Sequence, residues 1–306
     1  MPSPPDEAGR ESGGPGVTPH HYGATEVVVG PETAGVVHPQ VALPPATLDV
    51  SIVVPYYNPG TRLRHTVDQM LQVLRDYEAS FEIITVSDGS TDGSPLSLEG
   101  LPDDVIRNVV LERNGGKGQA LQVGLALGRG RYLGFLDADG DLSPSLLAPF
   151  LTLMRLYEPD IILGSKRHPM SSVHYPPVRR AYSWGYQQLI RVLFNLQVRD
   201  TQVGIKLIDR EVIAAVLPLL VERRFAFDLE LLVVANHLGY DKLFEAPVRI
   251  EERFSSTISS RAVLGMLADT LSIFVRLRML RFYDKKAIPS IAGTLSVSGP
   301  EAPGSS

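Results

Sequence analysis

The sequence predicts an α/β protein built on a mostly parallel sheet with helices on its faces. Three observations support this prediction. Short apolar or β-branched runs of strand length alternate with segments of helical periodicity over residues 49–285. Polar or acidic turns follow several of the runs, as expected where parallel strands end at one sheet edge. The 306 residues are 44% hydrophobic, which is enough to fill a core.

The expected elements follow in order along the chain. The strands are short runs rich in β-branched residues, and the helices have apolar positions three and four residues apart. Strands are predicted at residues 49–55, 81–86, 108–111, 132–136 and 160–163, and helices at residues 61–77, 119–127 and 144–157. Because parallel strands need crossover connections, this alternation implies right-handed βαβ units.

Composition changes at both ends of the chain. Residues 1–48 are rich in Pro, Gly, Thr and Ser, and residues 286–306 repeat that character. Such segments bury too little apolar surface to offset the entropy of ordering, so we expect both to be disordered. We recognise no secretion signal and no apolar run of about 18 residues that would span a membrane. The expectation is one folded domain at residues 49–285.

Cysteine content and charge exclude several functional classes. The chain contains no cysteine, so disulfide frameworks, zinc–cysteine sites, iron–sulfur centres and thiol nucleophiles are excluded. The net charge of -5 argues against a dedicated nucleic-acid binder, which usually carries a basic excess. No nucleic-acid partner is therefore expected.

An acidic turn follows the predicted strand at residues 132–136. Asp137, Asp139 and Asp141 alternate with small residues, and an extended backbone would point all three carboxylates to one face. Oxygen ligands at this density suit Mg²⁺ or Mn²⁺, with substrate phosphates completing the coordination. An exposed acidic turn is the alternative. An EF-hand is excluded because the twelfth position counted from Asp137 is Ala148.

A glycine-rich run, NGGKG at residues 114–118, precedes a predicted helix. Its backbone amides and the helix N-terminus could face a phosphate group. The alternative is a flexible turn between a strand and a helix. The run is not a P-loop, because Gln119 follows Gly118 where Lys would be required, and the chain lacks the G-x-G-x-x-G motif of hydride-transferring dehydrogenases.

Four motifs at strand ends resemble those of family 2 glycosyltransferases with the GT-A fold. They are VVPYYN at residues 53–58, SDGSTDG at 87–93, NGGKG at 114–118 and LDAD at 136–139. Three further strings resemble polyprenyl-phosphate hexose synthases, above all the dolichyl-phosphate beta-glucosyltransferase branch: GSKRH at 164–168, RDTQVGIKL at 199–207 and FAFDLELL at 225–232. The resemblance covers residues 49–285 and implies a GT-A, Rossmann-like sheet flanked by helices.

The resemblance also implies roles for individual residues. It assigns nucleotide-sugar binding to Pro55, Tyr57, Val86, Asp88, Lys117, Asp137 and Ala138. It assigns the acceptor phosphate to Lys166, Arg179, Ser183 and Arg253, the metal to Asp139 and Asp141, and catalysis to Asp137, Asp139, Arg179 and Arg253. Asp228 and Glu230 have two interpretations, a general base or groups that orient cations or cap a helix.

The implied reaction is metal-dependent, inverting transfer of a hexose to polyprenyl phosphate, giving a β-linked sugar. UDP-glucose is the first choice of donor and Mg²⁺ or Mn²⁺ the implied cofactor. A phosphate acceptor is already an anion near neutral pH, so it needs no general base. The alternatives are GDP-mannose or UDP-N-acetylhexosamine as donor, or a degenerate, non-catalytic module that binds sugar nucleotide or lipid.

Two segments are expected to meet a membrane surface. Residues 176–196 and 261–283 combine aromatic or apolar side chains with Arg and Lys, which is typical of amphipathic interfacial helices. Packing on the protein's own sheet is the alternative for each. We expect a cytoplasmic enzyme held peripherally at the cytoplasmic face of the membrane, with a membrane protein such as a flippase as a further partner.

Overall fold

The structure is a computed structural model that describes residues 27–29, 42–171, 177–248 and 260–284. The strands are β1 (Val27–Val29), β2 (Leu48–Tyr56), β3 (Phe81–Ser87), β4 (Ile106–Leu111), β5 (Gly130–Leu136), β6 (Ile161–Ser165), β7 (Ile205–Asp209) and β8 (Leu243–Pro247). The α-helices are α1 (Arg62–Asp76), α2 (Lys117–Leu127), α3 (Leu147–Tyr157), α4 (Pro177–Phe194), α5 (Arg210–Val216), α6 (Phe227–His237) and α7 (Ser260–Phe274). Short 3-10 turns lie at Ser94–Leu98, Pro144–Leu146, Leu217–Leu219 and Phe282–Asp284, and a π-helical turn at Val275–Met279.

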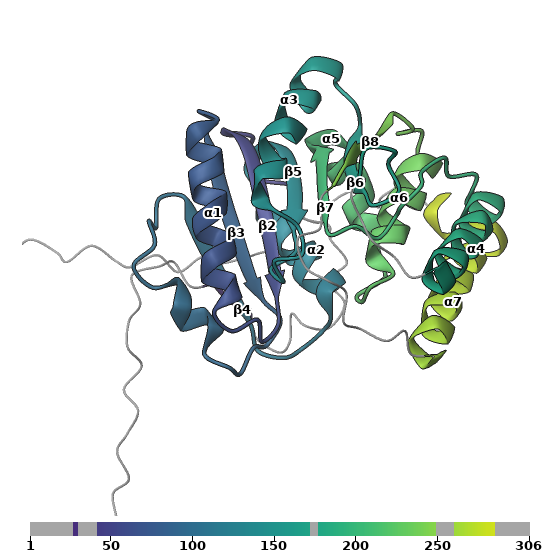
Figure 1. Cartoon of the computed structure of the whole chain (residues 1–306), viewed down its shortest axis with the longest axis horizontal. Coiled ribbons are helices and arrows are strands. Elements are labelled where there is room, and N and C mark those ends of the chain that lie inside the picture. Colours follow the sequence, from purple (N-terminus) through teal and green to yellow (C-terminus); the bar gives the residue numbers. More distant parts are fainter. Residues whose placement is uncertain (1–26, 30–41, 172–176, 249–259, 285–306) are drawn as a thin grey trace, which may run out of the picture.

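The described strands form one sheet in the order β1-β4-β3-β2-β5-β7-β6-β8 (Figure 1). Strand β7 runs antiparallel to both of its neighbours, and the other pairings are parallel. The mostly parallel sheet expected from the sequence is therefore confirmed. All five predicted strands and all three predicted helices are present, with boundaries shifted by a few residues.

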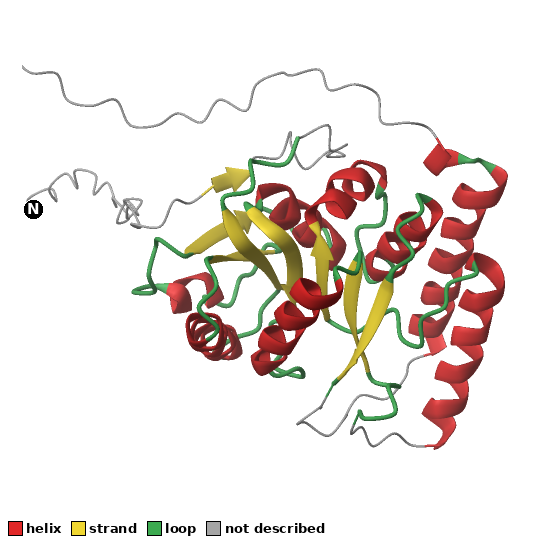
Figure 2. Cartoon of the chain, turned by 90° about the horizontal axis from the view of Figure 1, so that it is seen from above, coloured by secondary structure: helices red, strands yellow, loops and turns green. Residues whose placement is uncertain are grey.

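Helices cover both faces of the sheet (Figure 2). The core on one face includes Leu63 and Met70 of α1 packed with Phe150 of α3. The core on the other face includes Leu121 of α2 and Leu231 of α6. Because successive strand residues point to opposite faces, the uninterrupted apolar runs of the central strands fill both cores.

Strand β1 corrects one part of the predicted leader. The sequence composition predicted disorder throughout residues 1–48, but Val27–Val29 pairs in parallel with β4 and forms the edge of the sheet, in the register Val28↔Val110. Three consecutive valines have high strand propensity, and the edge of the sheet offers unpaired backbone groups. Residues 1–26, 30–41 and 285–306 lie outside the described part of the chain.

Helices α4 and α7 lie side by side at one end of the molecule (Figures 1 and 2). The Tyr186 hydroxyl is 2.9 Å from the Thr270 hydroxyl, and the rings of Phe194 and Phe274 pack edge to face. The two helices thus pack against each other, and their expected contact with a membrane surface remains a prediction. Among the described residues, no helix combines the length and the apolar character needed to cross a bilayer.

Candidate active site

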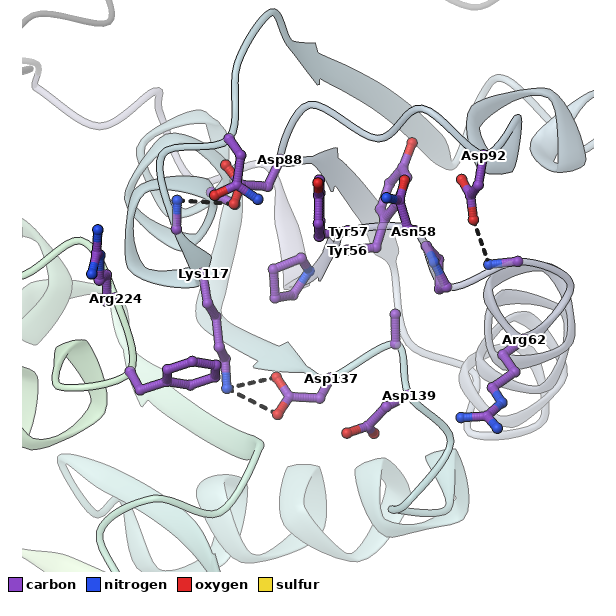
Figure 3. A pocket seen from close by; sticks show the side chains of 18 residues that line it. Tyr56, Tyr57, Asn58, Arg62, Asp88, Asp92, Lys117, Asp137, Asp139 and Arg224 are labelled. Atoms are coloured by element: carbon purple, nitrogen blue, oxygen red, sulfur yellow. Dashed lines mark hydrogen bonds and ion pairs between the residues drawn. The ribbon is translucent and has the colours of Figure 1, made fainter. Parts of the chain in front are cut away.

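A cavity of about 990 Å³ opens at the carboxyl ends of β2, β3 and β5 (Figure 3). These three strands are parallel neighbours, so their C-terminal turns meet at one edge. The cavity is lined by Pro55, Tyr56, Tyr57, Asn58, Pro59, Gly60, Arg62, Asp88, Asp92, Asn114, Gly116, Lys117, Ala120, Asp137, Ala138, Asp139, Arg224 and Phe225. Four sequence motifs that lie far apart in the chain therefore contribute to one site.

Most of the predicted nucleotide-sugar residues are part of this lining. They are Pro55, Tyr57, Asp88, Lys117, Asp137 and Ala138. Val86 is the exception, because its side chain is fully buried in the core. It packs beneath α2, where a Cβ atom added to Gly124 would lie 3.1 Å from Val86 Cγ2. The predicted contact between Val86 and the nucleotide remains a prediction.

The glycine-rich run holds the carboxylate of Asp88. The backbone amides of Gly115 and Gly116 donate hydrogen bonds to Asp88 Oδ1 and Oδ2 at 2.7 and 2.9 Å. Two amides that the sequence suggested for a phosphate thus bind a carboxylate of the protein. This arrangement fixes Asp88 at the cavity wall and ties the turn after β3 to the start of α2.

Glycine is also required here because residues 222–224 lie against the start of α2. A Cβ atom at Gly116 would be 2.4 Å from the carbonyl oxygen of Arg223, and one at Gly118 would be 2.8 Å from the carbonyl oxygen of Glu222. The backbone amide of Gln119 donates to the same Arg223 oxygen at 3.1 Å. The glycines therefore serve close backbone packing, which brings Arg224 to the cavity.

Two carboxylates and two lysines alternate in a row that begins at the cavity wall and continues into the protein interior. Lys117 Nζ lies 2.7 Å from Asp137 Oδ1 and 3.5 Å from Asp228 Oδ2. Asp228 Oδ1 in turn lies 2.5 Å from Nζ of Lys206. Asp228 and Lys206 have almost no solvent exposure, and both lysines lie over the ring of Phe135. We call Asp137, Lys117, Asp228 and Lys206 the charge row.

Burial and charge act against each other in the charge row. Burial raises the pKa of Asp137, and the nearby Lys117 opposes that rise. Burial also disfavours ionised Asp228, but the charges of Lys117 and Lys206 outweigh it and hold the pKa of Asp228 below its ordinary value. Burial likewise opposes the charge on Lys117, yet Asp228 and Asp137 raise its pKa overall. The structure therefore favours the interpretation in which Asp228 orients cations.

Sequence reasoning did not identify Lys206 as a site residue. The available signal was a single Lys inside the apolar strand GIKLI and a single Asp inside the apolar run FAFDLELL. A buried charge needs a partner of opposite sign, so these two exceptions in apolar elements could have been paired.

The close approach of Gly204 holds Asp137 in place. The Asp137 backbone amide donates to the carbonyl oxygen of Gly204 at 2.9 Å. A Cβ atom at Gly204 would lie 2.0 Å from Asp137 Oδ2. Any side chain at this position would displace the carboxylate from the end of β5.

The predicted metal ligands differ in position. Asp139 is exposed and lines the cavity, whereas Asp141 does not line it and donates its backbone amide to Asp139 Oδ1 at 3.1 Å. Within the ranges that the structure describes, no three His, Asp or Glu side chains gather as a metal site. Mg²⁺ and Mn²⁺ need no such cage where substrate phosphates supply ligands. Asp139 therefore fits a role as protein ligand, and the role of Asp141 remains a prediction.

The acceptor residues are only partly described. Lys166 follows the end of β6, and its backbone amide donates to Asp200 Oδ2 at 3.3 Å. Burial raises the pKa of Asp200, and the charge of Lys166 opposes that rise. Ser183 is exposed on α4, and neither Lys166 nor Ser183 lines the cavity. The Arg179 side chain and the whole of Arg253 lie outside what the structure describes.

Known proteins resemble this chain in both sequence and fold. Residues 51–217 match the family model described as glycosyl transferase family 2. A dolichyl-phosphate beta-glucosyltransferase of Dictyostelium discoideum is 31% identical over 205 residues, 62% of this chain and 63% of that relative, so the chain spans less than two thirds of its length. A dolichyl-phosphate beta-glucosyltransferase of Mus musculus is 32% identical over 255 residues, 76% of each protein.

A solved structure shows the same fold. It is glucosyl-3-phosphoglycerate synthase from Mycobacterium tuberculosis in complex with Mn²⁺, uridine diphosphate and glucosyl-3-phosphoglycerate. The TM-score is 0.55 at 20% identity, over 74% of this chain and 80% of the other. At that identity the likeness shows the fold alone, and it confirms the GT-A architecture expected from the motifs.

Proposed function

Because this chain belongs to glycosyl transferase family 2, we propose that it transfers glucose from UDP-glucose to polyprenyl phosphate and releases UDP. The observation that carries the proposal is the meeting of Asp88, Asp137 and Asp139 around one cavity at the ends of neighbouring parallel strands. The names of the two relatives support the sugar and the lipid acceptor, since both are dolichyl-phosphate beta-glucosyltransferases.

In the proposed complex, Tyr57 and Asp88 lie on the side of the base and ribose, and Asp137 lies close to the ribose and diphosphate. Tyr57 is 53% exposed at the cavity mouth, where an aromatic ring can contact a base. Asp88 is held rigidly by two backbone amides, so it presents a fixed acceptor for hydroxyl groups. The charge row holds Asp137 in place before substrate binds.

Asp139 is the residue that would hold a divalent cation, Mg²⁺ or Mn²⁺. When bound, such a cation supplies positive charge that stabilises the departing nucleoside diphosphate. The solved structure from Mycobacterium tuberculosis contains Mn²⁺ with uridine diphosphate, which supports the use of a divalent cation. Because Lys117 already binds Asp137, Asp139 is the carboxylate of the two that faces the cavity without an ion-pair partner among the described residues.

The acceptor phosphate attacks the anomeric carbon in line with the bond to UDP. An oxygen of the phosphate forms the new bond to C1, the bond between C1 and the UDP oxygen breaks, and UDP leaves with the electron pair. The configuration inverts from the α-linked donor to a β-linked product. Lys166, Arg179 and Arg253 are proposed to hold the phosphate against repulsion from the diphosphate. The nucleophile is already anionic, so the step requires no general base.

A lipid acceptor brings the enzyme to a membrane surface. Helices α4 and α7 expose large apolar side chains, among them Trp184, Leu264 and Leu271. Arg191 lies exposed on the same helix as Trp184, and aromatic and basic residues together suit the headgroup region. We assign the enzyme to peripheral attachment at the cytoplasmic face, with a flippase as a partner for its lipid product.

A panel of radiolabelled donors tests the proposal. The wild-type protein is incubated with polyprenyl phosphate, Mg²⁺ or Mn²⁺ and one of UDP-glucose, GDP-mannose or UDP-N-acetylhexosamine, and the organic phase is counted. We expect label in the organic phase with UDP-glucose. Label that appears only with another donor would change the assigned donor sugar. The absence of label with every donor would reject polyprenyl phosphate as the acceptor.

The metal assignment is tested with Asp139→Asn at saturating Mn²⁺. Asp139 is exposed, so the variant should fold with wild-type stability and lose at least about a hundredfold in kcat. Normal activity of Asp139→Asn would reject the assignment. Asp241, which is exposed and does not line the cavity, provides the matched control Asp241→Asn.

A further inference from the structure

One wall of the cavity is a loop that approaches from the second half of the chain. Residues 221–225, here called the wall loop, connect the turn Leu217–Leu219 to helix α6. Arg224 and Phe225 line the cavity, and Phe225 remains 76% exposed there. The loop has no regular secondary structure of its own. Its position therefore depends on the groups that bind its backbone.

Glu230 of α6 anchors the beginning of the wall loop. Its Oε2 atom accepts hydrogen bonds from the backbone amides of Val221 and Glu222 at 2.8 and 2.7 Å. The Glu230 side chain is completely buried. Of the two interpretations of Glu230, a general base or a group that orients cations or caps a helix, the contacts favour the second, because Arg276 Nη2 lies 3.2 Å from the carboxylate. The bonds to backbone amides were not predicted.

The other oxygen of Glu230 is bound by residues from the C-terminal end of the described chain. Tyr283 Oη donates to Glu230 Oε1 at 2.6 Å, and Arg276 Nη2 lies 3.2 Å from the same atom. Arg276 also forms an ion pair with Glu222 of the wall loop and donates from Nε to Tyr283 Oη at 3.0 Å. Two residues beyond α7 thus hold both the loop and its anchor.

The chemistry of this cluster makes the C-terminal contacts necessary. Glu222 and Glu230 place two carboxylates around one guanidinium, and Tyr283 is 1% exposed. Removing Arg276 would leave a buried carboxylate without its cationic partner, which is unfavourable. Arg276 lies in the π-helical turn Val275–Met279, and such turns occur often at functional sites.

We propose that Arg276 and Tyr283 are positioning residues for the nucleotide-sugar site, acting through Glu222 and Glu230 on the wall loop. The proposal rests on the proposed function, because the loop's ligand is taken to be the nucleoside diphosphate part of the donor. When the loop is held in place in only a fraction of the molecules, apparent affinity for the ligand falls by that fraction. The segment that follows α7 is then part of the donor site.

Three variants of the full-length protein test the role. Tyr283→Phe removes one hydroxyl from the cluster, and Arg276→Ala removes the cation. Arg276→Lys keeps the positive charge, so its defects should be smaller than those of Arg276→Ala. Tyr157→Phe and Arg75→Ala are matched controls, because both side chains are exposed and the residues belong to α3 and α1.

Two measurements distinguish an effect on the position of the wall loop from an effect on the transfer reaction. Amide hydrogen exchange is followed on the peptide that contains Val221 and Glu222, and the affinity for UDP is measured by calorimetry. We expect faster exchange and about tenfold weaker UDP binding for Tyr283→Phe, since the lost hydrogen bond is made to a carboxylate. In the transfer assay the donor KM should rise by a similar factor with kcat within about twofold, because the loop binds and does not react.

Each arm can reject the proposal. Unchanged exchange in Tyr283→Phe and Arg276→Ala would show that the cluster does not hold the loop, whatever the substrate. Faster exchange with unchanged UDP affinity and donor KM would show that the loop does not shape the site. If the wild type itself bound no UDP, the proposed function would fail, while the exchange measurement would still decide whether the cluster holds the loop.

Discussion

Lys117 Nζ lies 2.7 Å from Asp137 Oδ1 at the carboxyl end of β5. This ion pair gives the two acids of the DAD motif different environments. Asp137 is bound from the protein side, whereas Asp139 is exposed toward the cavity. The same lysine extends to Asp228, so the position of Asp137 depends on residues more than ninety positions further along the chain.

Asp228→Asn tests the charge row. The variant keeps the shape of the side chain but leaves Lys117 and Lys206 without their shared carboxylate. Breaking a buried ion pair in this way should lower the free energy of unfolding by about 3 kcal/mol, measured in urea. The exposed control Asp241→Asn should stay within about 0.5 kcal/mol of wild type. Equal stability of the two variants would contradict the buried pairing.

Gly204→Ala tests the close approach at Asp137. The added Cβ atom would lie 2.0 Å from Asp137 Oδ2, so the carboxylate must move. We expect kcat/KM to fall at least about tenfold, because catalytic geometry tolerates little displacement. Gly185→Ala is the control, since open space surrounds that helical position and alanine there should add up to about 1 kcal/mol of stability. Wild-type kcat/KM in Gly204→Ala would contradict the geometry.

The fold was largely predictable because local patterns determine the elements of a parallel sheet. The run FEIITV became β3, and its polar continuation placed Asp88 at the sheet edge. The antiparallel direction of β7 was not predicted. The same short apolar sequence can run either way, and only its neighbours β5 and β6 decide the direction. Val27–Val29 was missed because three residues are too short to show periodicity.

The site was predictable in its residue types and less so in its contacts. Asp88 and Asp137 were identified from motifs, and both line the cavity. The partners were not identified, since a sequence does not show that Gly115 binds Asp88 or that Lys117 binds Asp137. Tyr283 and Glu230 are 53 positions apart, and pairings of such separation depend on tertiary packing.

The buried carboxylate of Glu82 should make the stability of the protein depend on pH in the acidic range. The buried carboxylate accepts hydrogen bonds from Ser51 and Arg129 at 2.7 and 2.9 Å. Burial alone would raise the pKa of Glu82, but these bonds outweigh burial and lower it below its ordinary value of 4.5. A lowered pKa in the folded state stabilises the protein above the unfolded pKa, and that stabilisation is lost as the pH falls through the folded value.

Comparison with Glu82→Gln isolates this contribution. At pH 7 the free energy of unfolding of the variant should be about 2 kcal/mol lower than that of wild type, because hydrogen bonds to a charged group are lost. The difference should be smaller at an acidic pH below the lowered folded-state pKa of Glu82, where the wild-type carboxyl group is protonated, than at pH 7. Exposed Glu99 provides the control Glu99→Gln. A difference of the same size at both pH values would contradict the assignment.

Vesicle flotation tests the surface formed by α4 and α7. Leu264 and Leu271 are 67% and 57% exposed, and we expect the double variant Leu264→Ser, Leu271→Ser to bind anionic vesicles at least about tenfold more weakly. Leu156, on α3 and 68% exposed, provides the control Leu156→Ser. Equal flotation of the two variants would place membrane contact elsewhere.

The most direct test of the proposed reaction compares two acceptors that differ only in the phosphate. Wild-type protein, Mn²⁺ and radiolabelled UDP-glucose are incubated with polyprenyl phosphate or with the corresponding polyprenol, and the organic phase is counted. Because the proposed nucleophile is the phosphate anion, which would need no general base, label should enter the lipid only with polyprenyl phosphate. Equal label in polyprenol, or none with polyprenyl phosphate, would contradict glucosyl transfer to a lipid phosphate.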